Sequence, residues 1–260
     1  MKDFKVIESK ENSLIKLISN LQTSAKARRE NSLFVLEGLR ICKDALDNGI
    51  RFDKLIVSRT AFEKCNDDIL TFAENSKECV KIPDTLVSKI SDTKTPQGIF
   101  AVVSIPKNKL SNIQKNGRYI ALENVSDPSN LGAISRTAEA LGVSGIILSS
   151  NGVDPYSPKA LRASMGTLLR MPLVVLDDFS NQINSLGLKV YSSVVESSAK
   201  SITDLTITEG SVIVIGNEAN GITEETKSAS DELFTIRMKG SAESLNASVA
   251  AAISIWEMMK

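Results

Sequence analysis

Short, continuously apolar runs separated by helical segments are the feature of this sequence that most restricts its fold. The run Val212-Ile213-Val214-Ile215 is apolar at every position, so it has no face suited to water. Strands of this kind are buried on both faces, as in parallel sheets covered by helices. The second half of the chain therefore predicts a mainly parallel, doubly wound α/β sheet. Its expected strands are residues 119–122, 145–148, 173–176, 189–193, 212–215 and 234–236, with a closing helix over residues 244–258.

The first half alternates helical and strand patterns less regularly. Helices are predicted over residues 13–21 and 39–47, and strands over 33–36, 54–57 and 98–103. About 100 residues patterned in this way predict a small α/β sandwich domain. A polar, basic stretch that runs from a proline to a glycine follows. We therefore expect one domain over residues 1–105, a linker over 106–117 and a second domain over 118–260.

The sequence gives no indication of a membrane protein, a secreted protein or a metal-binding protein. No apolar run approaches the roughly 20 residues that span a bilayer, and charges interrupt the first residues where a signal peptide would be apolar. The cysteines, Cys42, Cys65 and Cys79, form no CxxC pair, so neither a zinc site nor a disulfide framework is indicated. We expect a cytoplasmic protein without a metal.

The chain contains no histidine, and this narrows its possible chemistry. Ser-His and Cys-His triads are excluded, as are histidine bases and metal ligands. Any catalysis must use other side chains or a cofactor that already carries an activated group. Residues 1–116 hold 20 of the 31 Lys and Arg residues but 15 of the 31 Asp and Glu residues. This mildly basic front half favours contact with a polyanion, although a chance distribution of surface charge remains an alternative.

A polar loop follows the predicted strand 119–122 and leads into a helix. Asp127 and Pro128 mark the helix start, because proline disfavours the helical conformation in the residue before it. Asn130 lies close to that start, and Arg136 lies on the side opposite the apolar stripe. Such an arginine can reach over the strand ends or across to a partner chain. A solvated arginine and a simple asparagine cap account for the segment as readily.

Two further polar segments follow later strands. Gly216 and Gly221 come after the run 212–215 and allow a ligand to approach the backbone closely, or merely permit a tight turn with a solvated Glu218. Ser244 is the expected N-cap of the closing helix, whose start favours an anion such as a ligand carboxylate; a capped helix without a ligand is the alternative.

The interior of that closing helix is expected to comprise Val249, Ala252, Ile253 and Trp256. Loops at the carboxyl ends of parallel strands converge on one edge of the sheet. Three polar segments in such loops therefore predict a ligand site at that edge.

These segments resemble, in order, the three motifs of the SpoU (TrmH-type) branch of the SPOUT methyltransferase superfamily. They match N-x-x-D-P-x-N-x-G-x-x-x-R over residues 124–136, G-N-E-x-x-G over 216–221 and E-S-L-N-x-S over 243–248. The resemblance extends over roughly residues 117–260. The front half is similar to the substrate-binding domain of the same family, with matching parts at residues 9–21, 34–40 and 95–98.

The resemblance implies a deep trefoil knot, formed where the loops at Gly216 and Ser244 pass one another, although ordinary folding rules make knots rare. It also implies a homodimer through the catalytic domain and S-adenosylmethionine bound in the knot. The implied cofactor-binding residues are Gly216, Asn217, Ile236, Met238, Ser244 and Leu245. The implied catalytic residues are Asn130, Arg136, Glu218, Ser244 and Asn246.

The reaction that the resemblance implies is methyl transfer to a ribose 2′-hydroxyl of structured RNA. A sulfonium group supplies an activated methyl, which agrees with the absence of histidine. Arg136 is the general base proposed for the family. A guanidinium normally stays protonated, so binding the neighbouring phosphate or stabilising the developing alkoxide is an equally good role for it.

Ribosomal RNA is the expected substrate, because a separate N-terminal domain belongs mostly to the ribosomal RNA enzymes of this family. A transfer RNA enzyme, a resistance enzyme that methylates the large subunit, and a non-catalytic RNA-binding protein that kept the knot are the alternatives. Basic residues of the front half are candidate phosphate contacts, with ordinary solvated charge as the alternative for each. They are Lys26, Arg28, Arg29 and Arg40.

Overall fold

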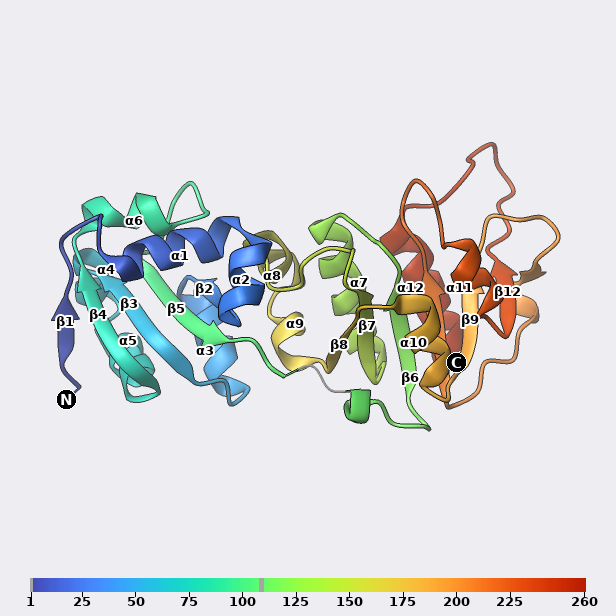
Figure 1. Cartoon of the computed structure of the whole chain (residues 1–260), viewed down its shortest axis with the longest axis horizontal. Helices are drawn as coiled ribbons and strands as arrows, with labels where there is room; N and C mark the ends of the chain where they lie inside the picture. The colour runs from blue at the N-terminus through green and yellow to red at the C-terminus, as the bar shows by residue number, and fades with distance from the viewer. Residues whose placement is uncertain (1, 108–109) are drawn as a thin grey trace. The chain divides into compact units, whose positions relative to one another are not determined.

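The computed structural model describes residues 2–107 and 110–260, which divide into two compact units (Figure 1). Unit 1 comprises Met1–Pro106 and Tyr156–Arg162, and unit 2 comprises Lys107–Pro155 and Ala163–Lys260. The predicted second domain therefore contains a short segment that groups with unit 1. Part of the predicted linker, residues 108–109, lies outside the described residues. Among the residues described, no helix is both long and apolar enough to cross a membrane.

Unit 1 contains a five-stranded sheet in the order β1-β4-β3-β5-β2. β5 runs antiparallel to its neighbours β3 and β2, whereas the remaining pairings are parallel. The strands are β1 (Phe4–Val6), β2 (Leu33–Glu37), β3 (Phe52–Ser58), β4 (Ser76–Ile82) and β5 (Ile99–Ser104).

Helices cover both faces of this sheet (Figure 1). Phe100 and Val102 of β5 pack with α1 and α6, and the residues that alternate with them point to the opposite face. α3 and α5 contact the strands on that second face. Unit 1 is therefore an α/β sandwich, as its sequence predicts. Its helices are α1 (Ser13–Thr23), α2 (Ala25–Asn31), α3 (Leu39–Asp47), α4 (Arg59–Lys64), α5 (Asn66–Glu74) and α6 (Asp84–Ile90).

Unit 2 contains a seven-stranded sheet in the order β10-β12-β9-β11-β6-β7-β8. All of its described pairings are parallel, which confirms the predicted parallel sheet. The strands are β6 (Arg118–Leu122), β7 (Gly145–Ser149), β8 (Leu173–Leu176), β9 (Lys189–Ser193), β10 (Lys200–Ser201), β11 (Ser211–Ile215) and β12 (Glu232–Thr235).

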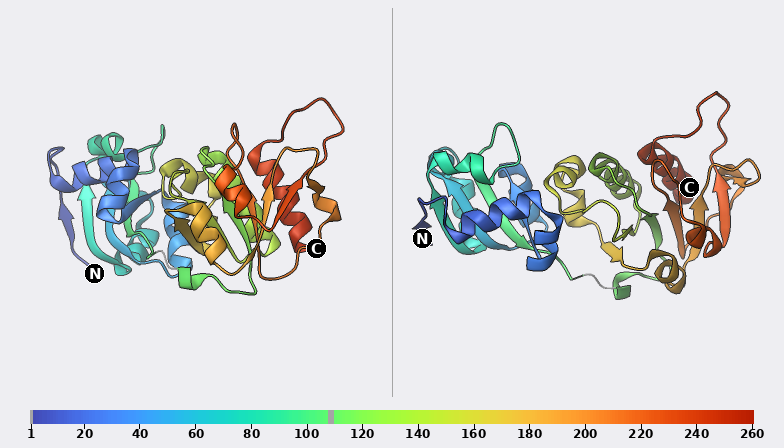
Figure 2. Two further views of the ribbon diagram at one scale, coloured as in Figure 1. Left: turned by 45° about the vertical axis from the view of Figure 1, so that its right-hand side comes forward. Right: turned by 45° about the horizontal axis from the view of Figure 1, so that its top comes forward.

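α10 packs on one face of the unit 2 sheet, and α7 and α12 pack against each other and against strands on the other face (Figure 2). Every residue of β7 and β11 is buried, as expected for strands covered on both sides. The helices after residue 127 are α7 (Pro128–Leu141), α8 (Pro158–Ser164), α9 (Thr167–Arg170), α10 (Phe179–Ser185), α11 (Glu224–Ser228) and α12 (Ala247–Met259). Two short 3-10 helices, η1 (Leu110–Asn112) and η2 (Ile202–Asp204), also occur in residues 110–260.

Most of the predicted strands of unit 2 are confirmed. The predictions at residues 173–176 and 189–193 coincide with β8 and β9, and three others are one residue shorter than β6, β7 and β11. The prediction at 234–236 lies too late, since β12 starts at Glu232. Two short strands, β1 and β10, were not predicted, and neither was β4, whose first residues are polar.

The start of the closing helix differs from its prediction. α12 begins at Ala247, and Asn246 is its N-cap, accepting a hydrogen bond from the Ser248 backbone N–H at 2.8 Å. The prediction that Ser244 caps this helix is therefore wrong. Serine and asparagine are both good N-caps, and the sequence alone does not decide which of two such residues two positions apart starts the helix.

The buried face of α12 also differs from the prediction. Val249 and Trp256 are 46% and 59% exposed, and Ala252 and Ile253 are only half-buried. The predicted interior therefore lies on the outer side of the helix in the single chain. α12 is apolar around most of its circumference, so its pattern does not identify the side that packs on α7. The residues that it buries are Ala247, Ala251, Ser254, Ile255 and Met258.

Candidate active site

The register of the unit 2 sheet brings two of the motif loops together. Leu122 at the end of β6 pairs with Ile215 at the end of β11, and the strands are parallel. The loops that follow them therefore leave the sheet side by side. The Glu123 backbone N–H donates to the Ile215 carbonyl at 2.9 Å, which continues the pairing one residue beyond the strands.

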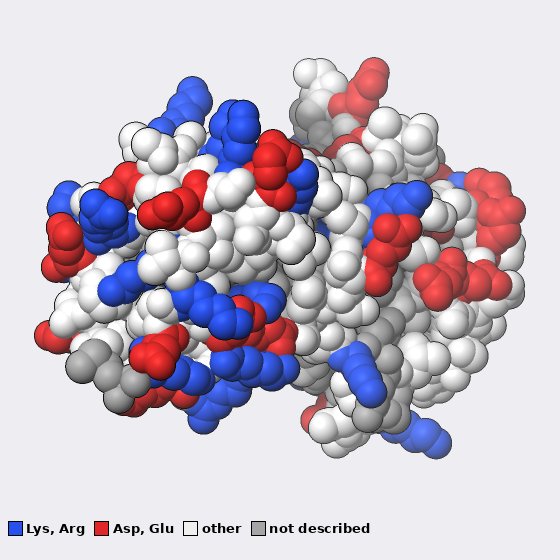
Figure 3. Space-filling model, turned by 60° about the vertical axis from the view of Figure 1, so that its left-hand side comes forward, with Lys and Arg blue, Asp and Glu red and all other residues white. Residues whose placement is uncertain are grey.

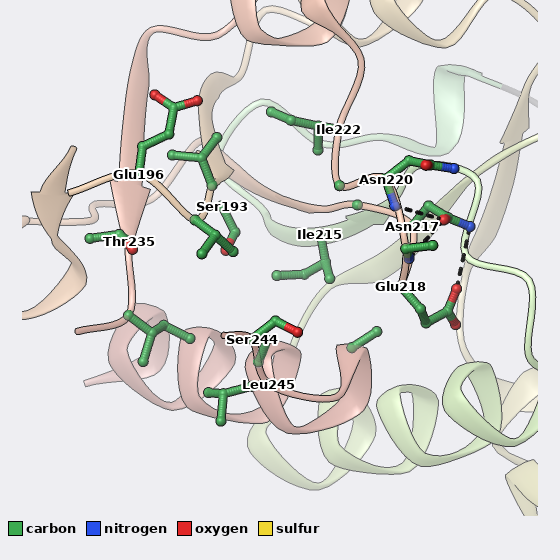
Figure 4. Close-up of a pocket in the computed structure, with 18 of the residues that line it drawn as sticks. Ser193, Glu196, Ile215, Asn217, Glu218, Asn220, Ile222, Thr235, Ser244 and Leu245 are labelled. Atoms are coloured by element: carbon green, nitrogen blue, oxygen red, sulfur yellow. Dashed lines mark hydrogen bonds between the residues drawn. The ribbon is translucent and has the colours of Figure 1, made fainter. Parts of the chain in front are cut away.

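A cavity of about 460 Å³ lies at this edge of the sheet. Its walls are residues 193–196 after β9, residues 215–222 after β11, the beginning of α11, and the chain between β12 and α12. In Figure 4, Glu196 and Glu218 lie at opposite ends of the cavity, with Ile215 between them. The structure brings all six predicted cofactor-binding residues to this cavity: Gly216, Asn217, Ile236, Met238, Ser244 and Leu245.

The loop after β11 is a tight hairpin that its own backbone closes. Asn217 and Gly221 exchange two backbone hydrogen bonds of 2.9 Å each. A Cβ atom on Gly216 would overlap the backbone of Gly221 and Ile222. The sequence suggested that glycine is needed here to admit a ligand, but the closest neighbour of Gly216 is the returning chain. Gly221 also has a positive φ of 69°, which glycine adopts without strain.

The side chain of Asn217 fixes this hairpin to the loop after β6. Its Nδ2 group donates to the Asn124 carbonyl at 2.8 Å, and its Oδ1 atom accepts from the backbone N–H groups of Ala219 and Asn220 (Figure 4). Asn124 has a positive φ of 55°, a conformation that asparagine tolerates better than most residues. Asn217 is therefore a structural link as well as part of the cavity wall.

Glu218 lies at the start of α7, where it accepts hydrogen bonds from several groups. Its carboxylate accepts from Asn130 Nδ2 at 2.7 Å, from the Ser126 backbone and hydroxyl at 3.3 and 3.2 Å, and from the Asp127 backbone at 3.5 Å. The beginning of a helix favours a negative charge because of its free N–H groups and its dipole. Glu218 thus joins the second motif to the first.

This environment keeps Glu218 ionised. Desolvation is the largest influence and opposes ionisation, but the hydrogen bonds from Asn130, Ser126 and Asp127 together outweigh it and lower the pKa of Glu218. At neutral pH the group is therefore a carboxylate whose oxygens are already engaged. It is better suited to hold its neighbours than to remove a proton.

Asn130 connects all three motifs. Its side chain is 6% exposed; its amide donates to Glu218, and its Oδ1 atom accepts from Asn246 Nδ2 at 3.1 Å. Asn246 in turn caps α12. The contact series Glu218–Asn130–Asn246 therefore fixes the loop after β11, the start of α7 and the start of α12 relative to one another.

Arg136 lies on α7, six residues beyond Asn130, and its side chain is exposed. It is not among the residues that line the cavity. Within the described part of the chain it forms no hydrogen bond or ion pair, so its guanidinium is available to a ligand or to another chain. Four of the five predicted catalytic residues, Asn130, Glu218, Ser244 and Asn246, are joined to one another or line the cavity.

Several residues of the site were not predicted from the sequence. Ser193 ends β9 and Glu196 follows it, and both line the cavity together with Lys227 of α11, which donates to Glu196 at 2.9 Å. The adjacency of β9 and β11 would have identified them, but strand order is not written in the local pattern. Glu123, buried just after β6, was also missed.

The four basic candidates of unit 1 fall into two groups. Lys26, Arg29 and Arg40 are exposed, and on the face of unit 1 in Figure 3 many Lys and Arg side chains lie among Asp and Glu side chains. Arg28 is 4% exposed, and its guanidinium donates to the carbonyls of Leu21 and Gln22. Arg28 is thus a buried cap for the end of α1, and the prediction that it contacts RNA does not fit its position.

Comparison with known proteins identifies the family that has this sheet, this cavity and these motifs. The model of the SpoU rRNA Methylase family matches residues 117–256, and the chain belongs to this family. The model of the MRM3-like substrate binding domain matches residues 12–101.

Individual relatives resemble most or nearly all of the chain. The 23S rRNA (guanosine(2553)-2′-O)-methyltransferase RlmP of Bacillus subtilis is 30% identical over 98% of this chain and 99% of its own length. The 23S rRNA (uridine(2479)-2′-O)-methyltransferase of Streptomyces viridochromogenes is 28% identical over 71% of this chain and 68% of its own. The AdoMet-bound rRNA methyltransferase from Sinorhizobium meliloti matches with a TM-score of 0.84, at 28% identity, over 98% of this chain and 97% of that structure.

Proposed function

We propose that this protein transfers a methyl group from S-adenosylmethionine to a ribose 2′-hydroxyl of ribosomal RNA. Membership of the SpoU family and relatives named as 23S rRNA 2′-O-methyltransferases support the proposal. The observation that carries it is the contact series Glu218–Asn130–Asn246, which assembles three separate motif loops beside one cavity.

The cavity is suited to S-adenosylmethionine in size and in chemistry. Its volume of about 460 Å³ falls within the usual range for small-molecule sites. Apolar side chains, among them Ile215, Ile222 and Leu245, provide surface for an adenine ring. The lining carries more carboxylates than cations, and this net negative charge favours a ligand with a positive charge; the charged lining residues are Glu196, Glu218, Glu224, Glu243 and Lys227. Bound there, S-adenosylmethionine would supply a methyl group activated by its sulfonium.

The remaining task of the protein is to align and activate the hydroxyl. Asn130 and Asn246 provide amide groups of fixed orientation near the cavity, and Ser244 adds an exposed hydroxyl. Such preorganised groups reduce the entropic cost of alignment. Arg136 would bind the adjacent phosphate or stabilise the developing alkoxide with its free guanidinium. Glu218 would act by holding Asn130, because its own oxygens are occupied.

We also propose that the protein works as a homodimer through α12. The side chains of Val249 and Trp256 are exposed on the outer side of this helix, with Ile253 between them. Apolar residues spaced three and four apart form a stripe suited to helix packing. Dimerisation would bury this stripe, and it would explain why the sequence pattern suggests an interior at these positions. The same arrangement would allow Arg136 to act near a subunit boundary.

Unit 1 would capture the RNA substrate. The substrate-binding model matches most of it, and Lys26, Arg29 and Arg40 are exposed cations available to phosphates. We further expect a cytoplasmic location, where ribosomal RNA is modified. The knot implied by the family would lie where the loops at Gly216 and Ser244, which both line the cavity, pass one another.

The proposal is tested by incubating the protein with S-adenosylmethionine labelled in its methyl group and with ribosomal RNA. Nuclease digestion should then release a labelled 2′-O-methylnucleoside from ribosomal RNA. Transfer RNA and an Asn130→Ala variant serve as the comparison samples. If only transfer RNA became labelled, the substrate would be transfer RNA and not ribosomal RNA. If the protein bound RNA but no RNA became labelled, a non-catalytic RNA-binding protein would be favoured.

A further inference from the structure

A buried carboxylate lies directly behind the hairpin that lines the cavity. Glu123 follows β6 and is 3% exposed. It accepts hydrogen bonds from the Thr223 backbone N–H at 3.0 Å, from the Thr223 hydroxyl at 2.7 Å and from the Thr226 hydroxyl at 2.9 Å. All three partners belong to the beginning of α11, which follows the hairpin.

Joining two segments through a buried carboxylate costs more free energy than joining them through neutral groups. A buried charge costs free energy unless it is paired or fully hydrogen-bonded. Within residues 2–107 and 110–260, no Lys or Arg side chain forms an ion pair with Glu123, and its partners are neutral donors. Neutral polar or apolar packing would connect the same segments at lower cost. Buried polar groups that cost stability in this way are found mainly at functional sites, where they hold a required geometry.

The geometry that Glu123 fixes is the cavity wall. Its backbone N–H holds the end of β11 through the Ile215 carbonyl, and its carboxylate holds Thr223. The hairpin between those two points, together with Glu224 and Lys227 of α11, lines the cavity. Glu123 itself does not line it. Its influence on a ligand must therefore pass through these neighbours.

We infer that Glu123 is a positioning residue for the cofactor site, and that its carboxylate holds residues 216–227 in the form that accepts S-adenosylmethionine. This inference rests on the proposed function, because it places the cofactor in this cavity. The Thr223 hydroxyl also caps α11 by accepting from the Thr226 backbone N–H at 3.2 Å. The carboxylate, the cap and the hairpin thus form one cooperative unit.

The test is a Glu123→Gln substitution, which preserves the shape of the side chain but removes its negative charge and replaces one of its two accepting oxygens with an NH2 group. Isothermal calorimetry should show S-adenosylmethionine and S-adenosylhomocysteine both bound about 10-fold or more weakly, by the same factor. The KM for S-adenosylmethionine should rise accordingly, whereas kcat at saturating cofactor and the KM for RNA should change less than about twofold. Thr226→Val, which removes one of the three donors, should produce the same pattern with a smaller loss.

Glu139 offers a control in the same unit. Its carboxylate also accepts from a threonine hydroxyl, that of Thr167 at 2.8 Å, and it forms an ion pair with Arg170 at 2.7 Å, but it lies outside the cavity wall. Glu139→Gln should leave cofactor affinity unchanged. Unchanged affinity in a folded Glu123→Gln protein would overturn the inference. A loss confined to the cationic S-adenosylmethionine would overturn it as well, because the charge would then act directly on the sulfonium. If the wild-type protein bound neither ligand, the cofactor site itself would be wrong.

Discussion

Unit 1 and unit 2 each use a glutamate at the end of a strand to fix a loop, but with different results. In unit 1, Glu37 at the end of β2 accepts from Gln22 Nε2 at 3.1 Å, from the Asp92 backbone at 2.9 Å and from the hydroxyls of Ser91 and Thr93. In unit 2, Glu123 after β6 holds the beginning of α11. The loop that the first glutamate fixes takes no part in the cavity described above, whereas the segment that the second fixes forms part of its wall.

Strand direction explains the difference. β2 pairs with β5 in antiparallel fashion, with Glu37 opposite Phe100, so the end of β2 lies beside the beginning of its neighbour. β6 and β11 are parallel, and their carboxyl ends lie together. Loops converge only in the second case, which is where α/β proteins bind ligands. Chemistry is therefore expected from unit 2 and RNA contact from unit 1, and the following variants test that division.

The largest effect is expected for Arg136→Ala in unit 2. Methyl transfer should fall by at least about 100-fold, the scale for loss of a preorganised charge. Stability should change by no more than about 0.5 kcal/mol, because the side chain is exposed. Single-turnover rates and urea denaturation measure the two quantities. Lys189→Ala, at the opposite end of β9 from the cavity, is the control.

Arg136→Lys separates two roles of the same residue. Partial rescue would indicate electrostatic stabilisation, whereas no rescue would indicate a need for the planar guanidinium. Full activity of Arg136→Ala with RNA and cofactor bound would remove this residue from the mechanism.

The next effect concerns Trp256, the one aromatic residue of α12. Trp256→Glu should convert the proposed dimer into monomers, because it would place a charge in the proposed apolar interface, and activity should fall about 10-fold or more. Sedimentation analysis measures the assembly. A second exposed apolar residue outside α12, Leu110, is 43% exposed and supplies the control variant Leu110→Glu. A wild-type monomer with full activity would contradict the proposed dimer.

Two adjacent arginines of unit 1 should behave differently. Arg29→Ala should weaken RNA binding by up to about 10-fold and reduce the salt dependence by about one charge, while cofactor affinity stays constant. Arg28→Ala should instead reduce stability by about 2 kcal/mol, since it removes charge-assisted bonds to the end of α1. Fluorescence anisotropy at several salt concentrations and denaturation separate the two. Equal loss of RNA affinity in both folded variants would contradict this assignment.

The smallest effect is the pH dependence at Glu218. In the folded protein, desolvation raises the pKa of Glu218, but hydrogen bonds from Asn130 and neighbouring groups outweigh this effect, so that the pKa of Glu218 is lowered. The ionised Glu218 side chain contributes its full share of the unfolding free energy above about pH 4.3, the pKa of glutamate in an unfolded chain. This contribution is lost as the pH falls through the lower pKa of the folded protein. The difference in unfolding free energy between wild type and Glu218→Gln should therefore be constant from about pH 5 to 8 and shrink below about pH 4. A difference that changes between pH 5 and 8 would mean that the pKa is raised.

The local pattern of apolar and polar residues was sufficient to predict most strands of this chain, but not which side chains contact one another. β11 could be predicted because a strand buried on both faces is apolar along its length, as residues 212–215 are. The short strands β1 and β10 carry too little pattern to detect. The outer side of α12 was taken for its inner side because apolarity does not reveal whether a helix packs within one chain or against another.

The candidate site shows the same limit. Motif residues such as Asn130 and Glu218 could be identified from the sequence because their spacing is distinctive. Their mutual hydrogen bond, and the partnership of Glu123 with Thr223, depend on strand order and join residues about a hundred positions apart. Arg28 could not be distinguished from Arg29 until the packing of α2 on the end of α1 was known.

Calorimetric titration of the wild type and of Gly216→Val shows whether the cavity beside β6 and β11 holds S-adenosylmethionine. A valine side chain would push the hairpin apart, because a Cβ atom there overlaps the backbone of Gly221. We predict one site per chain in the wild type and no measurable binding in the variant, with circular dichroism showing both proteins folded. Unchanged affinity in folded Gly216→Val would place the cofactor elsewhere and contradict the account.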